Sequence, residues 1–144
     1  MRSGKANSTV SGFTLMELLV VLVIIGLLAA LVGPMVYQRI APARASVARA
    51  QIDNLTRALD GFFVDTGRYP NSQEGLRALT ARPDGVVKWK GPYLKKAVPP
   101  DPWGQPYRYR SPGTKGPFEI VSFGADGKPG GEDEDRDISN WSND

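Results

Sequence analysis

The hydrophobic residues of this chain are concentrated near its N-terminus. From Leu18 to Gln38 the sequence has 21 consecutive residues without a charged side chain. As an α-helix such a run is about 31 Å long, and the hydrocarbon core of a bilayer is about 30 Å thick. The pattern therefore predicts one membrane-spanning helix. A buried helix of a soluble protein is the alternative, but its apolar run is usually shorter.

A cleaved secretory signal peptide is a second alternative, because Arg2 and Lys5 precede the apolar run. Such a peptide has an apolar stretch of about 7–15 residues, followed by an A-x-A-like cleavage site. Here the run is longer, and the pair Ala29-Ala30 lies inside it. The pattern favours a retained membrane anchor over an ordinary signal peptide.

A helical pattern continues beyond the apolar run, but with only one apolar face. Apolar residues recur there at spacings of three and four, as on one side of an α-helix. They are Ala48, Ile52, Leu55, Leu59 and Phe62. We expect one long helix over about residues 14–64, ended by the Asp-Thr-Gly sequence at 65–67. Pro34 and Pro42 each remove a helical hydrogen bond, so they are expected to bend or loosen it.

The following segments predict short elements that cover this apolar face. Asn71, with Glu74 three residues later, is typical of a capped helix start and predicts a short helix over residues 74–79. The Asp-Pro-Trp-Gly sequence at 101–104 favours a type I turn.

Two short strands are predicted next, over residues 106–110 and 118–123, and a Ser-Pro-Gly sequence between them predicts an antiparallel hairpin. Tyr and Arg alternate in the first strand. A base-stacking surface uses the same residue types, but a strand with one buried and one exposed face explains the alternation better. The predicted fold class is therefore α+β, with a long N-terminal helix packed on a small antiparallel sheet.

The composition excludes several classes of function. The chain has no Cys and no His, so it contains neither a disulfide, a thiolate metal site nor a Ser-His-Asp triad. Its net charge of +3 is too small to indicate nucleic acid as a partner. A membrane-tethered hydrolase could use Asp and Glu, but no paired carboxylates stand out beyond the C-terminal loop. We therefore expect a protein that is not an enzyme.

The loop at residues 124–137 is acidic and rich in glycine. It places five acids within six residues, and these repel one another unless water or a cation neutralises them. Carboxylates on pliable backbone suit Ca²⁺, which takes about six to eight oxygen ligands. The loop is not an EF-hand, because Lys128 and Gly130 stand where that motif has acid or amide ligands. From composition alone, a solvated loop and a calcium site both remain open.

The residues that lead into the apolar run carry a second signal. Small residues precede Phe13, and Glu17 is the only charged residue between Phe13 and Gln38. An acid at the centre of a span costs about 2.5–3.5 kcal/mol and usually marks function. The alternative is a first-turn acid that the helix dipole favours.

The sequence Ser-Gly-Phe-Thr-Leu-Met-Glu at residues 11–17 resembles the processing motif of type IV prepilins and type II secretion pseudopilins. The resemblance implies that a membrane aspartyl prepilin peptidase cleaves between Gly12 and Phe13, and that the amine of Phe13 is methylated. It also implies that Glu17 pairs with the N-terminal amine of a neighbouring subunit. Physics supports such a pair, since a carboxylate and an amine removed from water are tolerable only when they meet.

Motifs in the second half extend the resemblance to the major, G-type pseudopilins of type II secretion systems. Adhesive type IV pilins share only the N-terminal half and usually carry a C-terminal disulfide loop, which the absence of Cys excludes here. The motifs are Tyr69-Pro70, Gln73-Glu74-Gly75-Leu76, Gly91-Pro92-Tyr93-Leu94, Asp101-Pro102-Trp103-Gly104-Gln105-Pro106-Tyr107 and Ser122-Phe123-Gly124-Ala125-Asp126-Gly127.

This resemblance implies a pilin-like fold and a structural subunit that polymerises into a pseudopilus, which helps drive folded proteins across the outer membrane. Residues 1–12 would be a cleaved leader, 13–34 a transmembrane and filament-core helix, and 35–144 a periplasmic domain. The protein would be single-pass in the bacterial inner membrane. The implied partners are further copies, minor pseudopilins, the prepilin peptidase, the inner-membrane assembly platform and membrane lipid, with no nucleic acid.

The resemblance also implies a structural Ca²⁺ ion in the acidic loop. The implied ligands are the side chains of Asp126, Asp133 and Asp135 with the backbone carbonyls of Phe123 and Lys128, while Glu132, Glu134 and Asp137 leave the set open. Two other functions are weighed against the pseudopilin. One is a type IV pilin-like or minor pseudopilin subunit. The other is a membrane-anchored, calcium-dependent binding module that works as a monomer, without processing or a role for Glu17.

Overall fold

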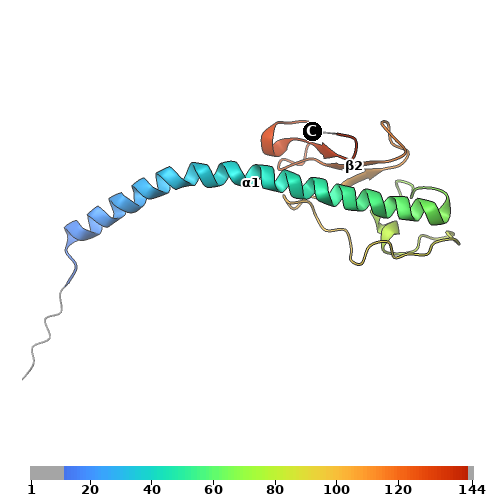
Figure 1. Ribbon diagram of the computed structural model, residues 1–144, viewed down its shortest axis with the longest axis horizontal. Coiled ribbons are helices and arrows are strands. Elements are labelled where there is room, and N and C mark those ends of the chain that lie inside the picture. Colours follow the sequence, from blue (N-terminus) through green and yellow to red (C-terminus); the bar gives the residue numbers. More distant parts are fainter. Residues whose placement is uncertain (1–11, 143–144) are drawn as a thin grey trace, which may run out of the picture. The chain divides into compact units, whose positions relative to one another are not determined.

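The computed structural model of the chain describes residues 12–142, with only the backbone described over residues 34–41. Residues 1–11 of the expected leader lie outside the described residues. The chain forms two compact units, Met1–Gln38 and Arg39–Asp144. Figure 1 shows the elements, which in chain order are α1 (Leu15–Thr66), the 3₁₀ helix η1 (Leu76–Leu79), β1 (Arg108–Arg110), β2 (Glu119–Ser122), the 3₁₀ helix η2 (Asp133–Asp135) and β3 (Ile138–Ser139).

The long helix expected from the sequence is confirmed. α1 is continuous past Pro34 and Pro42, so neither proline ends it. It ends where Gly67 adopts a φ of 79° and donates its N–H to the carbonyl of Phe63 at 2.7 Å. A left-handed residue just beyond a helix favours glycine, because a Cβ is penalised in that conformation.

The N-terminal unit contains the apolar part of α1. The segment Leu15–Gly33 is 19 residues long, has a mean hydropathy of 3.0 and buries none of its residues within the structure. A helix of this length and composition is able to cross a membrane, as the sequence predicts. The bilayer is then the solvent that covers its side chains.

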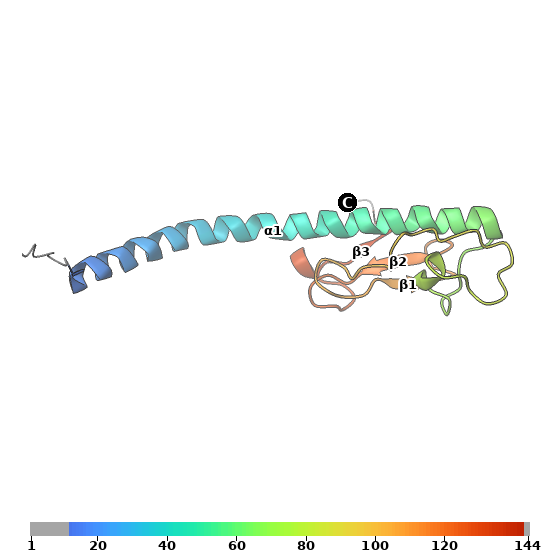
Figure 2. The same ribbon diagram turned by 90° about the horizontal axis from the view of Figure 1, so that it is seen from below.

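The core of the C-terminal unit forms along the apolar face predicted for the second half of α1. Ile52, Leu59 and Phe62 on this face are at most 1% exposed. They belong to one cluster with Leu79 of η1 and Ile120 of β2. The helix therefore packs on the sheet through the face that the spacing predicts, and Figure 2 shows the three strands beside α1.

The connection from α1 to η1 follows the predicted hydrogen bonds but not the predicted helix. The Asn71 side-chain oxygen accepts the N–H of Gln73 at 2.9 Å and of Glu74 at 2.8 Å, and Glu74 accepts the N–H of Asn71 at 2.8 Å. The helical residues nevertheless start only at Leu76. Gly75 has a φ of 57°, which interrupts the helical conformation and makes the prediction of a helix from residue 74 wrong at its start.

Arg68 fixes the same connection from outside. Its guanidinium donates two hydrogen bonds of 2.6 Å to the carboxylate of Glu74, in the bidentate geometry that suits this pair. These bonds hold the pKa of Glu74 below its ordinary value of 4.5. The turn after α1 is thus tied to η1 by charge as well as by the Asn71 cap.

The sheet is antiparallel with the order β1-β2-β3. Tyr109 pairs with Ile120 in the hairpin, which confirms both predicted strands with shorter ends. Ser139 of β3 pairs with Val121, and this third strand is not predicted by the sequence because two residues show no periodicity. Arg108 and Arg110 are exposed while Tyr107 is buried, as two-faced strand patterning predicts.

Candidate functional site

The first candidate site is the start of α1, where Thr14 and Glu17 bind each other. The carboxylate of Glu17 accepts the backbone N–H and the hydroxyl of Thr14, both at 2.9 Å. In return, the backbone N–H of Glu17 donates to the Thr14 hydroxyl oxygen at 3.2 Å. A Thr and a Glu in these positions form a capping box, which satisfies N–H groups that the first helical turn leaves free.

The residues around this capping box are open to their surroundings. Phe13 is 81% exposed and Leu15 is 80% exposed. A side chain placed on Gly12 would meet nothing within 4 Å. The bond between Gly12 and Phe13 therefore lies in non-helical backbone without steric cover from the described residues, which is the state that a peptidase needs.

The second candidate site is the loop between β2 and β3, which folds tightly on its own backbone. The N–H of Ala125 donates to the carbonyl of Glu134 at 2.9 Å. A Cβ on Gly124 would come within 2.5 Å of that same carbonyl oxygen, and one on Gly131 within 2.5 Å of the Asp135 carbonyl oxygen. Only glycine allows these approaches, so the glycines that the sequence shows here set the path of the loop.

Asp101 anchors the beginning of this loop to the rest of the unit. Its side chain is 4% exposed and accepts the N–H of Trp103 at 3.1 Å and of Gln105 at 2.8 Å. The hydroxyl of Ser122, at the end of β2, donates to the same carboxylate at 2.5 Å. Gly104 also donates its N–H to the Asp101 carbonyl at 2.9 Å, as the predicted turn requires. The sequence indicates the turn but not the bond to Ser122.

The acidic side chains of the loop are arranged more loosely than its backbone. Asp126 accepts the N–H of Lys128 at 3.0 Å, and Glu134 pairs with Arg44 of α1 at 3.3 Å. Asp133 has a φ of 51° and is exposed. Within residues 12–142, no three acidic side chains converge in the way that a metal site needs. The structure thus places Asp126, Asp133 and Asp135 in one loop without gathering their carboxylates.

One carboxylate oxygen in the loop nevertheless fits a cation. Asp137 uses Oδ2 to accept the N–H of Gly130 at 2.9 Å, while its Oδ1 is buried and has no hydrogen-bond partner among the described residues. A buried carboxylate oxygen without a partner is costly, and a bound cation removes that cost. The donor set is also made of hard oxygens on a glycine-rich backbone, which is the chemistry that Ca²⁺ prefers.

Two protein families match the chain, one at each of these sites. The family described as "Prokaryotic N-terminal methylation motif" matches residues 7–33. The family described as "Type II secretion system (T2SS), protein G" matches residues 35–141. The two matches follow each other directly and together cover almost the whole sequence.

Curated relatives and solved structures agree with these matches. The type II secretion system core protein G of Pseudomonas aeruginosa is 53% identical over 137 residues, which are 92% of this chain and 96% of that protein. The protein of the same name from Vibrio cholerae is 41% identical, with 91% of each chain covered.

A crystal structure of the major pseudopilin from the type 2 secretion system of enterohaemorrhagic Escherichia coli is also similar. It has a TM-score of 0.60 and 34% identity, and the match covers 69% of this chain and 88% of that one. The shared fold confirms the predicted pilin-like α+β class.

Proposed function

This chain belongs to the protein G family of type II secretion systems, the major pseudopilins, and on that premise we propose how its two candidate sites serve a pseudopilus. The protein is a structural subunit that polymerises into the secretion pseudopilus and helps drive folded proteins across the outer membrane. It is a single-pass protein of the inner membrane with its C-terminal unit in the periplasm. The observation that carries this function is the match of the protein G family over residues 35–141, directly after the methylation motif.

The start of α1 serves processing and assembly. Prepilin peptidase cleaves between Gly12 and Phe13, and the new amine of Phe13 is methylated. During assembly, Glu17 exchanges its bonds to Thr14 for the amine of a neighbouring copy. The exposed apolar segment Leu15–Gly33 leaves the bilayer and packs with the same segment of other copies in the filament core. Minor pseudopilins and the inner-membrane assembly platform are the further partners that such a subunit needs.

Mass spectrometry of the protein purified from its native membrane tests the processing step. We expect a mature chain that begins at Phe13 and carries one methyl group. The control is the same measurement on protein from a strain that lacks prepilin peptidase. The chain from that strain should retain Met1. A native chain that keeps Met1, or one cut beyond Gly33, contradicts the proposed cleavage.

We further propose that the loop between β2 and β3 holds a structural Ca²⁺ ion. The side chains of Asp126, Asp133 and Asp135 and the carbonyls of Phe123 and Lys128 would bind it, and Oδ1 of Asp137 would gain a partner. Glu132 and Glu134 remain further candidates for this set. The ion would neutralise the repulsion among the acids and fasten the loop that leads into β3.

Calcium titration of the C-terminal unit, Arg39–Asp144, tests this site. A ligand that binds only the folded state stabilises it by about 2.7 kcal/mol at a hundredfold excess over Kd. We expect the wild-type unit to show a rise in melting temperature with Ca²⁺, and Asp126→Ala to lose most of that rise. Asp84→Ala, which removes an exposed acid outside the loop, is the matched control. Equal calcium shifts in all three proteins would exclude Asp126 as a ligand.

A further inference from the structure

Two exposed loops of the C-terminal unit carry equal and opposite charges. The basic loop, residues 82–96, has five basic residues and one acid, a net charge of +4. The acidic loop, residues 124–137, has six acids and two basic residues, a net charge of −4. The basic residues of the first loop are Arg82, Lys88, Lys90, Lys95 and Lys96.

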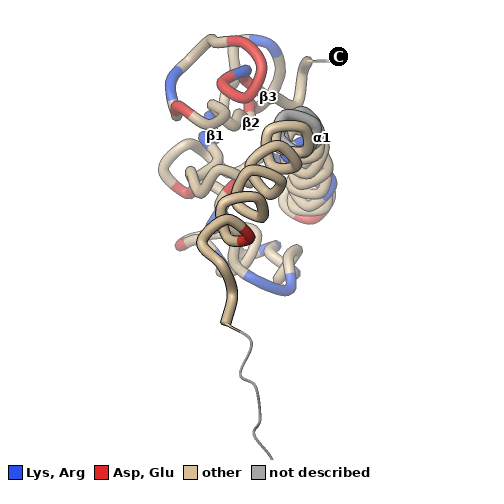
Figure 3. The backbone as a smooth tube through the Cα atoms, turned by 90° about the vertical axis from the view of Figure 1, so that its left-hand side faces the viewer, with Lys and Arg blue, Asp and Glu red and all other residues tan. Residues whose placement is uncertain are grey.

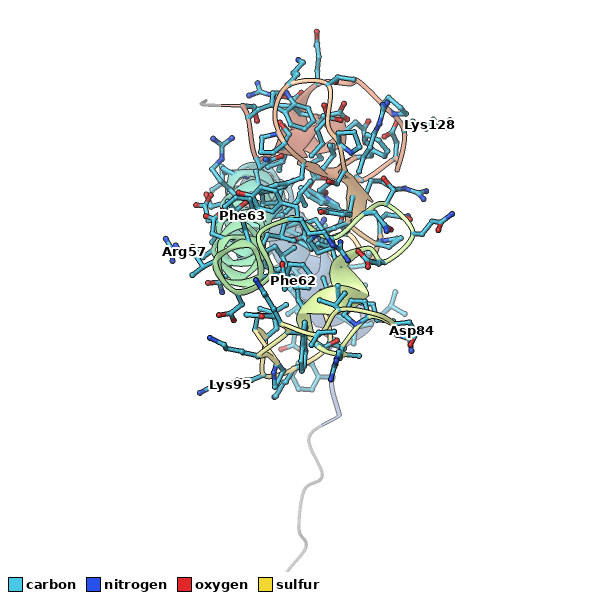
Figure 4. The ribbon with its side chains drawn as sticks, turned by 90° about the vertical axis from the view of Figure 1, so that its right-hand side faces the viewer. Arg57, Phe62, Phe63, Asp84, Lys95 and Lys128 are labelled. Carbon is cyan, nitrogen blue, oxygen red and sulfur yellow. The ribbon has the colours of Figure 1, made fainter. Side chains whose placement is uncertain are left out.

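The two loops lie at opposite ends of the unit. The acidic loop contacts α1 through the ion pair of Glu134 with Arg44, at 3.3 Å. The basic loop contacts α1 through Lys90, whose ammonium lies 3.6 Å from the carboxylate of Asp65. Asp65 follows Arg44 by 21 residues of one helix, which is about 31 Å at roughly 1.5 Å per residue. Figure 4, which looks along the long axis, shows Lys128 and Lys95 on opposite sides of the unit, and in Figure 3 the red acidic run lies beside β3.

Several charged side chains of the two loops form no ion pair within the part of the chain that the structure describes. Lys88, Lys95 and Lys96 are exposed and form no ion pair with any residue that the structure describes. The same holds for Glu132 and Asp133 on the acidic loop. An ion pair needs its two charged groups within about 4 Å. The two loops contact α1 at residues about 31 Å apart, and no ion pair joins them among the described residues.

We propose that the basic loop of one subunit binds the acidic loop of another copy in the pseudopilus. This interface rests on the proposed polymerisation and adds to it a specific contact between periplasmic units. Because the two surfaces differ and lie at opposite ends of the unit, each bound copy leaves one loop free for the next. Such a head-to-tail contact, repeated with a constant rotation, produces an open helical filament. Opposite charges also orient the incoming copy, since complementary potentials fix register.

The loops keep opposite charges whether or not calcium is bound. One Ca²⁺ ion in the acidic loop would reduce its net charge from −4 to −2, which still attracts a loop of +4. The side chain of Glu132 is exposed and accepts no hydrogen bond from the residues that the structure describes, so it is the acid best placed to face a neighbouring copy. Lys95 is the corresponding cation on the basic loop.

Disulfide crosslinking of assembled filaments tests the contact, because the chain has no Cys of its own. In full-length protein carrying Lys95→Cys and Glu132→Cys, mild oxidation should produce a ladder of covalent dimers, trimers and longer species. A disulfide needs Cα atoms within about 7 Å, whereas the two loops contact α1 at residues about 31 Å apart, so a bridge between copies is expected rather than one within a copy. Each single variant should give no ladder. Lys95→Cys with Thr114→Cys, on the exposed hairpin loop, is the matched control and should give none either.

Normal filaments of the double variant without a ladder overturn the contact while leaving polymerisation intact. Failure of the wild-type chain to form filaments would instead contradict the proposed function. A charge exchange provides a second measurement. Lys95→Glu and Glu132→Lys should each lower the yield of sheared filaments about threefold, and the two together should restore at least half of it. Additive losses in the combined variant would also overturn the contact. The two positions are expected to couple only if they meet across two copies.

Discussion

Replacing Phe62 with alanine is expected to destabilise the C-terminal unit by about 3–5 kcal/mol, the usual cost of removing a buried aromatic ring. Phe62 is fully buried at 0% exposure, on the face of α1 that packs on the sheet. Its ring meets the ring of Tyr93 edge-on, with the centroids 5.7 Å apart. Truncation therefore leaves a cavity at the centre of a small core, where a loss of this size is a large share of total stability.

The adjacent residue provides the control for this prediction. Phe63 is 43% exposed and stacks on Tyr69, with the ring centroids 4.8 Å apart. Phe63→Ala should cost about 1 kcal/mol, because it removes one aromatic contact and little buried area. Urea unfolding of Arg39–Asp144 measures both free energies. Similar losses for the two variants would mean that the core is not centred where the structure places it.

Replacing Glu17 with alanine should allow normal membrane insertion but reduce the yield of filaments more than tenfold. Leaving an amine unpaired where its partner carboxylate has been removed costs about 3–5 kcal/mol in a buried setting. This cost exceeds the free energy of about 1.4 kcal/mol that corresponds to a tenfold change. Electron microscopy of sheared fibres, with membrane fractionation of the same cells, measures assembly and insertion separately.

Glu17→Gln separates the capping role that the structure shows from the proposed pairing with a neighbouring amine. Glutamine is able to replace glutamate in a capping box, so it keeps the bonds to Thr14 while losing the charge. We expect this variant to assemble as poorly as Glu17→Ala, since the proposed pairing with an amine needs a carboxylate. Normal filaments from Glu17→Gln would show that capping of α1, rather than charge pairing, is the requirement for assembly.

The helix and its packing could be predicted from the sequence because they follow from periodicity. The spacing of Ile52, Leu59 and Phe62 fixes which face of α1 is buried, and those residues are the centre of the core. The hairpin follows from alternation and turn residues in the same way. The start of η1 could not be predicted, because the bonds of Asn71 suit a turn as well as a helix and the conformation of Gly75 decides between them.

The same distinction, between patterns local in sequence and contacts between distant residues, applies to the candidate sites. The processing motif and Glu17 are local in sequence, and the family matches agree with the resemblance drawn from them. The bond between Asp101 and Ser122 joins residues 21 positions apart, and no pattern within either segment encodes it. The calcium ligands stay a prediction, because the structure does not gather three acidic side chains of the described residues into a metal site.

The glycines of the acidic loop have a consequence for how an ion would bind there. Gly124 and Gly131 press against the carbonyls of Glu134 and Asp135, so contacts within the loop already fix the course of its main chain. Only side-chain torsions then remain to be frozen on chelation, and each costs far less entropy than ordering a residue's backbone. Calcium would therefore order only the side chains of a loop whose backbone is already in place. Each carboxylate would then contribute separately to the affinity.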